Sequence, residues 1–526
     1  MPFFSRMRAK VAYAHKANAN CIRIAETGVF MKYLVNSSEM KTYDTNTAGY
    51  FKVPSIVLME RAALAFVDEL ACQNVDTSKA LIVCGAGNNG GDGLAAARLL
   101  SQKKSDVTVV YVGNRESATE SNLLQLDILT AYGISVKEEI PKENYTVVID
   151  AIFGVGLTRE VTGKYAEKID QMNGLCGFKA AIDISSGLSA DTGKIFGTAF
   201  RADLTVTFAF AKCGSMLWPG VEYAGKVAVR EIGIDESSFL GKIPKFRMLE
   251  KEDIENLLPK RYAHSHKGTY GKLLMIAGSV NMAGAAILAA RAAICCGCGL
   301  VKVLTPAENR IILQTAVPEA VLETYDKNSR EIDFSPTICQ ADAIVIGPGL
   351  GDGDAAKELV EAVLRETEKP VLLDADALNI MAGKKSLLHM LGENKIITPH
   401  VGEMARLTGK EIWRIRTEIP DTAKEMSEKY HTVCVLKDFR TVSALPNGEL
   451  YLNTTGNSGM ATAGSGDVLS GLIGSLLAQG AAPGTAALLG VYLHGMAGDK
   501  KAEQYGERGL TASDLADGLK QIWNDL

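Results

Sequence analysis

The sequence predicts an α/β protein in which mainly parallel sheets are covered by helices. Short apolar runs alternate with helical stretches along the chain, which is typical of sheets built from strand–helix–strand units. The 51 glycines are dispersed at the ends of the apolar runs, where they indicate tight turns between strands and helices. With 526 residues the chain exceeds one ordinary hydrophobic core, so we expect two domains.

Composition excludes several classes of protein. The net charge of −5 gives no basic footprint, so we expect no nucleic-acid partner. The apolar run from Ala283 to Val301 approaches membrane length, but Arg291 lies in its middle, and we interpret the run as a buried helix. We therefore expect no membrane association.

The ten cysteines are scattered and mostly embedded in apolar segments, as expected of buried free thiols in a reducing, cytoplasmic compartment. Cys295, Cys296 and Cys298 form the one cluster. They lack a second pair of ligands at the spacing of a zinc site, so we expect helix packing rather than metal binding.

Residues 1–30 differ from the rest of the chain, because five basic residues precede the first acid, Glu26. This pattern is similar to a transit peptide. We prefer the alternative that residues 1–30 are a disordered or non-native extension ahead of a start at Met31. Deleting them is then expected to leave activity unchanged.

The first half contains a strand, a glycine loop and a helix in succession. Leu81–Cys84 is a short apolar run, Gly85–Gly93 follows, and Leu94–Leu100 has helical character. Gly85, Gly87 and Gly90 satisfy the dinucleotide fingerprint, but no acid ends the next strand about 20 residues later. No Gly-Lys-Ser/Thr follows either, so a Walker A loop is excluded.

Three residues of this loop also provide side-chain oxygens that could bind a ligand. Asn88, Asn89 and Asp92 would suit a hard cation or sugar hydroxyls. Asp150, Asp183 and Ser186 follow two later strands, and the carboxyl ends of parallel strands line one crevice, so we expect these groups to converge. The alternative for each isolated Asp is a turn or a helix cap.

A charged segment, Lys242–Lys267, places a domain boundary near residues 240–250. The second half repeats the alternation of strands and helices. We expect strands at Lys272–Ala277, Leu300–Leu304, Ala343–Ile346, Val371–Leu373, Lys395–Thr398 and Thr432–Leu436.

The most informative motif is the glycine-rich loop from Asn457 to Gly471, which leads into an apolar helix and carries Asp467 near the helix start. Unpaired N–H groups at a helix N-terminus favour a phosphate or a developing oxyanion. Asp467 is either a helix cap or a base that takes a proton from a hydroxyl beside the anion. His400 is either a hydrogen-bonded turn residue or part of the same pocket. Lys437 forms a surface ion pair or contacts a nucleotide phosphate.

These motifs together resemble the bifunctional NAD(P)H-hydrate repair enzymes, from Met31 to the C-terminus. The motifs that carry the resemblance are MERAA, GAGNNGGDG, DAIFGVGLTR, DISSGLSADTG, HKGTYGKLLMIAGS, IGPGLG, LDADALN, TPHVGE and AGSGDVLSG. The resemblance implies a Rossmann-like three-layer α/β/α epimerase domain at residues 31–243. It also implies a ribokinase-like, ADP/ATP-dependent dehydratase domain at residues 244–526.

By resemblance, the first domain interconverts the R and S hydrates of NADH and NADPH, in which water has added at C6 of the nicotinamide ring. Asp183 is the implied catalytic residue, and a potassium ion is implied at Asn89, Asp150 and Ser186. The implied substrate-binding residues are Asn88, Asn89, Gly90, Gly91, Asp92, Gly154, Val155, Gly156, Leu157, Thr158, Arg159, Glu160 and Asp183.

The second domain is expected, by resemblance, to dehydrate the S hydrate with Mg²⁺ and ADP or ATP. Asp467 would activate the hydrate hydroxyl for phosphorylation, and phosphate would then leave by elimination. The implied hydrate-binding residues are Ala285, Gly349, His400 and Asp467. The implied nucleotide-binding residues are Lys437, Asp438, Phe439, Arg440, Thr441 and Gly466.

One position departs from the family pattern, because Asp438 follows Lys437 where glycine is common. Two alternatives stay open: the second domain as a small-molecule, vitamin-precursor kinase, and the first as a ligand-binding module. The expected partners are NADHX, NADPHX, ADP or ATP, and further copies of the chain.

Overall fold

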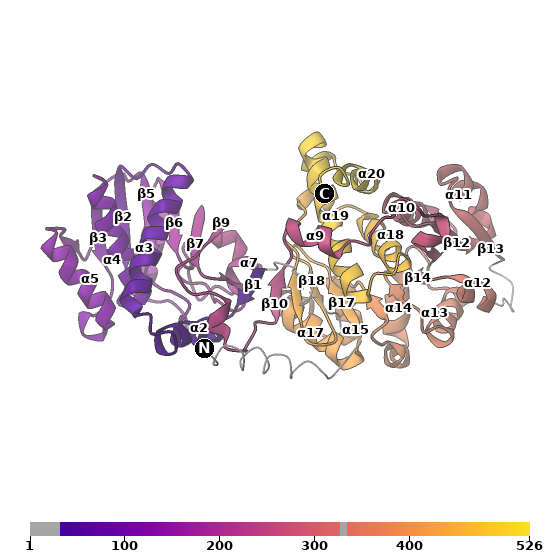
Figure 1. Ribbon diagram of the computed structural model, residues 1–526, viewed down its shortest axis with the longest axis horizontal. Helices are drawn as coiled ribbons and strands as arrows, with labels where there is room; N and C mark the ends of the chain where they lie inside the picture. Colours follow the sequence, from indigo (N-terminus) through magenta and orange to yellow (C-terminus); the bar gives the residue numbers. More distant parts are fainter. Residues whose placement is uncertain (1–31, 327–333) are drawn as a thin grey trace, which may run out of the picture. The chain divides into compact units, whose positions relative to one another are not determined.

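The computed structural model describes residues 32–326 and 334–526, so the expectation for residues 1–30 lies outside the described part of the chain. The described residues form two compact units (Figure 1). One contains Lys32–Arg247; the other contains Met248–Ile415 and Ile419–Leu526.

The N-terminal unit is built on a seven-stranded sheet with the order β4-β3-β2-β5-β6-β7-β9, in which every neighbouring pair is parallel. A short parallel pair, β1 and β8, lies outside this sheet. The strands are β1 (Lys32–Val35), β2 (Lys79–Cys84), β3 (Asp106–Tyr111), β4 (Val136–Lys137), β5 (Val147–Ala151), β6 (Phe178–Ile182), β7 (Leu204–Phe208), β8 (Ala211–Lys212) and β9 (Lys226–Arg230). The helices are α2 (Ser37–Gly49), α3 (Ser55–Cys72), α4 (Asn88–Gln102), α5 (Glu120–Ala131), α6 (Lys164–Gly174), α7 (Cys213–Met216) and α8 (Val221–Ala224).

Alternation along β2 explains the three layers of this unit. Ala80, Ile82 and Cys84 belong to a core that contains α3, α4 and α5, whereas Leu81 and Val83 belong to a second core that contains α6. Successive side chains of a strand point to opposite faces, so a strand that is apolar throughout must be covered on both sides. The predicted three-layer α/β/α arrangement is confirmed.

The C-terminal unit contains a sheet with the order β13-β12-β11-β14-β15-β16-β17, parallel throughout, which continues into antiparallel β18 and β19. The strands are β11 (Lys272–Ile276), β12 (Leu300–Pro306), β13 (Val321–Tyr325), β14 (Ala343–Ile346), β15 (Val371–Leu373), β16 (Lys395–Ile397), β17 (Val433–Leu436), β18 (Val442–Ala444) and β19 (Leu450–Leu452). A short strand, β10 (Phe246–Met248), lies where the chain passes from one unit to the other.

Helices cover both faces of this sheet. One face packs on the core of α10 (Ala283–Cys295), α18 (Ser465–Ala478), α19 (Pro483–Tyr505) and α20 (Ala512–Ile522). Figure 1 shows α13 (Asp354–Glu366), α14 (Asp376–Gly383), α15 (Val401–Thr408) and α17 (Ile419–Tyr430) along the other face. The remaining helices are α9 (Lys251–Leu257), α11 (Arg310–Ala316), α12 (Ser335–Gln340) and α16 (Ile412–Thr417).

The sequence patterns account for the different burial of these helices. In α13 the buried residues Ala356, Leu359, Val360, Val363 and Leu364 follow the 3–4 residue spacing of an amphipathic helix. In α18 every residue from Val468 to Ala478 is buried. An apolar helix without a polar face can only lie inside the fold, and α18 packs against α10, α19 and β14.

Two expectations need correction. The apolar run Ala283–Val301 is not one buried helix, because α10 ends at Cys295, Gly297 adopts a left-handed backbone, and β12 begins at Leu300. Similarly, the loop after β2 is shorter than expected, since α4 already begins at Asn88. Within the described residues no helix is long and apolar enough to span a bilayer.

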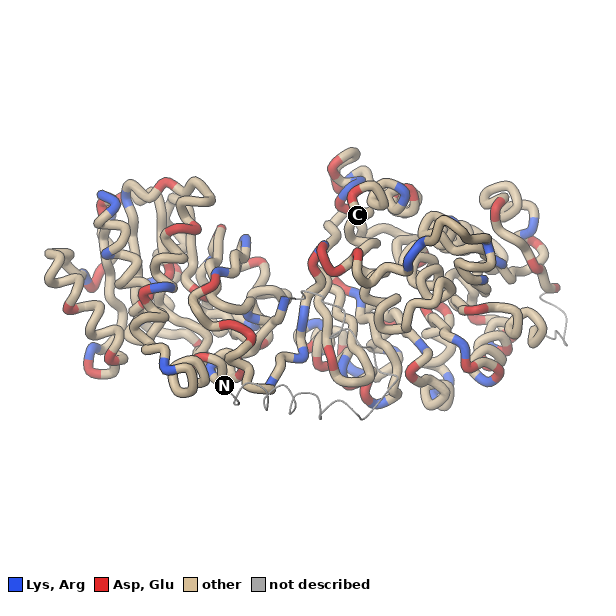
Figure 2. The backbone as a smooth tube through the Cα atoms, viewed as in Figure 1, with Lys and Arg blue, Asp and Glu red and all other residues tan. Residues whose placement is uncertain are grey.

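Acidic and basic residues are interspersed along the backbone of both units (Figure 2). All cysteines of the described chain are free thiols, and the Cys295–Cys298 cluster lies at the end of α10. The described residues contain no group of three or more His, Cys, Asp or Glu side chains placed to hold a metal ion.

Candidate active sites

The N-terminal unit contains a cavity of about 1040 Å³ at the carboxyl ends of its strands. Of the residues expected there, those that line the cavity are Asn88, Asn89, Asp92, Gly154, Val155, Gly156, Leu157, Thr158, Arg159 and Asp183. Gly90, Gly91 and Glu160 are not part of its lining. The sequence missed Asp44 and Lys212, which also line it.

Gly90 serves the fold of the loop. A Cβ atom at this position would lie 1.8 Å from the carbonyl oxygen of Gly85, so only glycine lets α4 start directly against the end of β2. This close approach carries Asn89 into the buried edge of the cavity, while Asn88 is exposed.

Asn89, Asp150 and Ser186 meet around Phe153. The Asp150 carboxylate accepts hydrogen bonds from the Ser186 hydroxyl and from the Ser186 backbone N–H, both at 2.7 Å. The Ser186 hydroxyl oxygen accepts from the Phe153 N–H at 2.8 Å, and Asn89 Nδ2 donates to the Phe153 carbonyl at 3.0 Å. Burial raises the pKa of Asp150 to about 6, even though these hydrogen bonds oppose the shift. The Oδ1 atom of Asn89 is buried and has no hydrogen-bond partner among the described residues.

Asp183 follows β6 with a left-handed backbone, φ 66°, which is unusual for a residue with a side chain. Its Oδ1 accepts hydrogen bonds from Thr207 Oγ1 at 3.1 Å and from the Phe208 N–H at 3.2 Å. Lys212 Nζ forms an ion pair with the same oxygen. The Lys212 side chain is only 1% exposed, and a lone lysine directly after an apolar strand is the signal by which the sequence could have indicated it.

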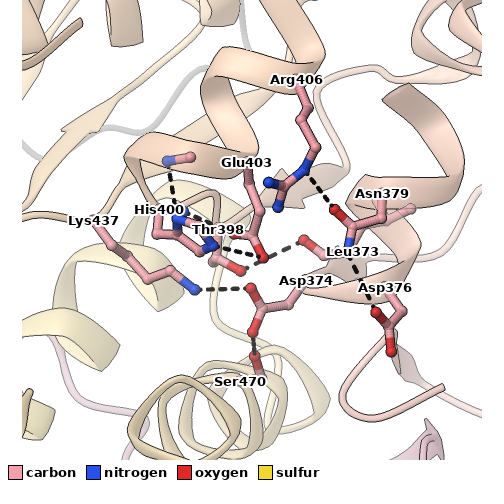
Figure 3. Close-up of polar contacts among 11 residues, drawn as sticks. Leu373, Asp374, Asp376, Asn379, Thr398, His400, Glu403, Arg406, Lys437 and Ser470 are labelled. Atoms are coloured by element: carbon pink, nitrogen blue, oxygen red, sulfur yellow. Dashed lines mark hydrogen bonds and ion pairs between the residues drawn. The ribbon is translucent and has the colours of Figure 1, made fainter. Parts of the chain in front are cut away.

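The C-terminal unit brings a second set of polar side chains to the carboxyl ends of β15, β16 and β17 (Figure 3). Asp374 follows β15 and is buried; its Oδ1 pairs with Lys437 Nζ at 2.9 Å and its Oδ2 accepts from Ser470 Oγ at 2.7 Å. Lys437 is therefore not a surface ion pair. Burial alone would raise the pKa of Asp374, but Lys437 and the hydrogen bonds from Ser470 and Thr398 outweigh it and lower the pKa.

Helix α18 begins at Ser465 behind Gly464, whose left-handed φ of 89° makes the turn into the helix. Gly464 is the N-cap and no side chain caps this helix end. Asp467 lies in the first turn, and its carboxylate accepts no hydrogen bond within the described part of the chain, so the interpretation of Asp467 as a cap is wrong. Burial, together with the charge of Asp374, raises the pKa of Asp467 to about 7, although Lys437 opposes the shift.

Neighbouring residues join this site through close packing. An added Cβ at Gly466 would lie 3.4 Å from Lys437 Nζ, and one at Gly349 would lie 2.8 Å from the Ala285 side chain. A Cβ at Gly464 would meet Leu288 of α10, the helix that carries Ala285. Gly466 therefore lies close to Lys437, Gly349 lies close to Ala285, and α10 contacts the start of α18 through Leu288.

His400 is a hydrogen-bonded turn residue, which is one of the two roles expected from the sequence. Its Nδ1 accepts a hydrogen bond from the Gly402 N–H at 2.9 Å, and with Glu403 it forms a capping box at the start of α15. Burial and the nearby Lys437 and Arg406 lower the pKa of His400, so the ring is neutral near pH 7. Burial raises the pKa of Glu403 to about 7.

The segment from Lys437 to Thr441 connects β17 to β18. Phe439 is 61% exposed, and the Arg440 guanidinium lies 5.2 Å from its ring centroid. Arg440 donates to the Thr454 carbonyl at 2.7 Å, while its buried Nε has no partner among the described residues. Sequence reasoning missed Asp374, Glu403, Ser470 and His494; buried His494 lies 3.5 Å from the Ser465 hydroxyl.

A further cavity of the C-terminal unit, about 610 Å³, contains none of the expected residues. It lies at the amino ends of β16 and β17, where Lys395 and Val433 begin these strands. Ligand sites of α/β sheets lie at the carboxyl ends of the strands, so the residues around Asp467, and not this cavity, form the candidate active site of the unit.

Comparison with known proteins decides the family. A family model described as "NAD(P)H-hydrate dehydratase" matches residues 273–521, and one described as "YjeF-related protein N-terminus" matches residues 55–214. The bifunctional NAD(P)H-hydrate repair enzyme of Moorella thermoacetica is 37% identical over 94% of this chain and 97% of its own length. The chain belongs to the family of bifunctional NAD(P)H-hydrate repair enzymes.

A second member of the repair-enzyme family also matches most of this chain. The enzyme of Coxiella burnetii is 38% identical over 89% of this chain and 94% of its own length. A similar solved structure is that of the Bacillus subtilis ADP/ATP-dependent NAD(P)H-hydrate dehydratase, co-crystallised with ATP and Mg²⁺. It is 33% identical, and the match covers 53% of this chain and 98% of that chain with a TM-score of 0.47.

Proposed function

We propose that the protein repairs hydrated nicotinamide cofactors, with residues 31–243 epimerising the R and S hydrates and residues 244–526 dehydrating the S hydrate. Membership of the repair-enzyme family supports both activities. The observation that carries the dehydratase assignment is Asp467, an unpartnered carboxylate with a pKa of about 7 in the first turn of α18.

In the proposed dehydration, Asp467 accepts the proton of the C6 hydroxyl while that oxygen attacks the terminal phosphoryl group of the nucleotide, and the bond from this group to the departing AMP or ADP breaks. A base with a pKa near the working pH is well suited to this transfer. The N–H groups at the start of α18 and the Lys437 ammonium would stabilise charge on the phosphoryl oxygens. Loss of phosphate from C6 and of a proton from C5 then restores the ring double bond.

The nucleotide would lie against the segment Lys437–Thr441. The unpartnered Nε of Arg440 is a buried donor that a bound phosphate or base could satisfy, and exposed Phe439 offers an aromatic face. Asp374, Glu403 and Asp467 give the site more carboxylates than Lys437 can neutralise, which fits Mg²⁺ held mainly by phosphates and water. Mg²⁺ would supply charge neutralisation on the transferring phosphoryl group.

The proposed epimerase site uses Asp183, with the hydrate bound along Asn88–Asp92 and Gly154–Glu160. A potassium ion would be held by Asn89, Asp150 and Ser186. The buried Oδ1 of Asn89 has no partner among the described residues, and Asn89 and Ser186 both bond the backbone of Phe153. This arrangement supports an oxygen-ligated cation there, since buried polar atoms rarely lack a partner. The ion would fix the loop that positions the substrate.

The function is tested with a mixture of hydrate epimers, ADP or ATP, and Mg²⁺, following the return of the reduced-nicotinamide absorbance. Complete conversion of the mixture is expected, because epimerisation feeds the R form to the dehydratase. Recovery of only the S fraction would contradict the epimerase assignment, and stable phosphorylation without recovery would favour a small-molecule kinase.

The potassium proposal has its own measurement. K⁺, compared with the same ionic strength of a tetraalkylammonium salt, should raise the melting temperature of the N-terminal unit. The effect should vanish in Asn89→Ala and persist in Asn88→Ala, the exposed neighbour. Equal stabilisation of both variants would show that K⁺ binds elsewhere.

A further inference from the structure

Four of the ionisable side chains that line the epimerase cavity have sharply different surroundings. Asp183, Asp92, Asp44 and Lys212 all line it. Asp92 projects from α4, Asp183 follows β6, and Lys212 ends β8, so the groups reach the cavity from separate elements. A site that inverts one carbon needs groups that give and take protons, and pairs of acids in unequal surroundings identify such roles.

Asp183 has the surroundings of a carboxylate. One of its oxygens, Oδ1, accepts from Thr207, Phe208 and Lys212, whereas Oδ2 has no hydrogen-bond partner within the described residues. Lys212 is itself fixed, because its Nζ also donates to the Phe208 carbonyl at 2.9 Å. Three donors occupy Oδ1 and leave Oδ2 as the oxygen that can accept a proton.

Asp92 has the opposite surroundings. Its carboxyl forms no hydrogen bond or ion pair with any described residue, although it lies beside the same cavity. Burial raises the pKa of Asp92 well above its usual range, and the charges of Asp183 and Asp44 add to this shift while Lys212 opposes it. Burial and the neighbouring carboxyl groups therefore favour the protonated form of Asp92.

We propose that Asp92 is a second catalytic residue of the epimerase, the proton donor that complements Asp183 as the acceptor, with Lys212 as the positioning residue that fixes Asp183. The inference rests on the proposed epimerase function and adds a role for Asp92 beyond substrate binding.

The step balances as follows for one direction. Asp92 gives its proton to the C6 hydroxyl, the C6–O bond breaks, and water leaves while the lone pair of N1 forms a C6=N1 iminium bond. A water molecule then adds to C6 from the other face, its proton passes to Asp183 Oδ2, and the iminium electrons return to N1. The hydrate has inverted, and solvent exchange restores both carboxyl groups.

The test uses the full-length protein and measures conversion of the R to the S hydrate without nucleotide. Asp92→Asn should lower kcat by roughly 10²–10⁴ with little change in KM, the usual cost of losing a general acid. In H₂¹⁸O the wild-type product should carry ¹⁸O at C6. The wild-type epimerisation rate should fall at high pH, where Asp92 loses its proton; the other ionisable groups around Asp92 are Asp44, Asp183 and Lys212. This fall should be absent from the residual activity of Asp92→Asn.

Control variants separate the possible outcomes. Asp106→Asn, an exposed carboxylate at the start of β3, should behave as wild type, and unchanged thermal unfolding of Asp92→Asn would show that it folds. If Asp92→Asn raises KM and leaves kcat unchanged, Asp92 only binds substrate. If Asp44→Asn loses activity and Asp92→Asn does not, Asp44 is the proton donor. Product without ¹⁸O would overturn the iminium step. Absence of epimerisation in the wild type would instead contradict the proposed function itself.

Discussion

At the residue scale, identical carboxyl groups acquire different chemistry from their neighbours. Asp374 and Asp467 belong to the same site, yet the pKa of Asp374 is lowered and that of Asp467 is raised to about 7. The difference follows from partners, because Asp374 has Lys437 and Ser470 within hydrogen-bonding distance and Asp467 has neither. A paired carboxylate is fixed as an ion, whereas an unpaired one is available to accept a proton.

Asp467→Asn should lower the rate of dehydration by roughly 10²–10⁴, because it keeps the shape of the side chain and removes its basicity. Since Asp467 caps no helix, the melting temperature should not fall. The measurement is steady-state turnover of the S hydrate with ADP or ATP, alongside a thermal melt. Near-normal turnover would leave the phosphoryl transfer without its base.

The dehydration rate of the wild type should rise with pH through about 7 and level off above it. Asp467 acts as a base only when ionised, and its pKa is about 7. Glu403 titrates in the same range, and Asp374, Asp376 and Lys437 are the other charges around Asp467. If the pH–rate profile of Asp467→Asn keeps the inflection near pH 7, the inflection belongs to Glu403 and not to Asp467.

The raised pKa of Asp467 also makes the stability of the fold depend on pH. Stability should fall as pH rises, whereas the dehydration rate should increase. The pKa of Asp467 is raised in the folded state, so its protonated form contributes stability that is present below about pH 4 and is lost as pH rises through about 7. At pH 8 the ligand-free Asp467→Asn protein should unfold at a higher urea concentration than wild type. At pH 4 the two midpoints should coincide, and a lower midpoint at pH 8 would contradict the burial cost.

At the element scale, the position of the N-terminal end of α18 depends on how closely this helix approaches α10. A Cβ at Gly471 would lie 2.0 Å from the Ala289 carbonyl oxygen, so glycine is required for the backbone contact. Helix propensity alone favours alanine over glycine by about 1 kcal/mol, and tertiary packing reverses that preference here.

Gly471→Ala should therefore destabilise the C-terminal unit and reduce dehydration, because α18 must shift away from α10 and displace Asp467. Gly284→Ala is the matched control, since Gly284 lies on α10 with no atom within 4 Å of an added Cβ. Urea unfolding and turnover of both variants give the measurement. Equal stability of the two variants would show that the contact can relax.

At the scale of the whole molecule, two compact units with separate cores carry two separate sites. Asp183→Asn should abolish epimerisation and leave nucleotide-dependent dehydration of pure S hydrate intact, and Asp467→Asn should do the reverse. Mixing the two inactive variants should restore complete repair of an epimer mixture. Loss of both activities in either variant would contradict this independence.

The sequence by itself determined the parallel α/β architecture, most strands of the C-terminal unit to within about two residues, and the motifs that identify the family, whereas β13, β18 and β19 were not predicted. These features are local, since alternation, apolar runs and glycine turns are written in consecutive residues. Asp467, Asn89 and Asp150 were likewise found from short motifs, and their neighbours in space were not needed to find them.

Only the tertiary structure showed which carboxyl groups have partners and which have none among the described residues. It excluded Asp467 as a cap, since Gly464 occupies the cap position, and it paired Lys437 with Asp374 across 63 residues of chain. It also showed that Lys212 forms an ion pair with Asp183, whereas Asp92 lines the same cavity without a partner among the described residues. The physical reason is that the charge of a buried group depends on its desolvation and on partners that folding brings from distant parts of the chain, and no local pattern encodes these distances.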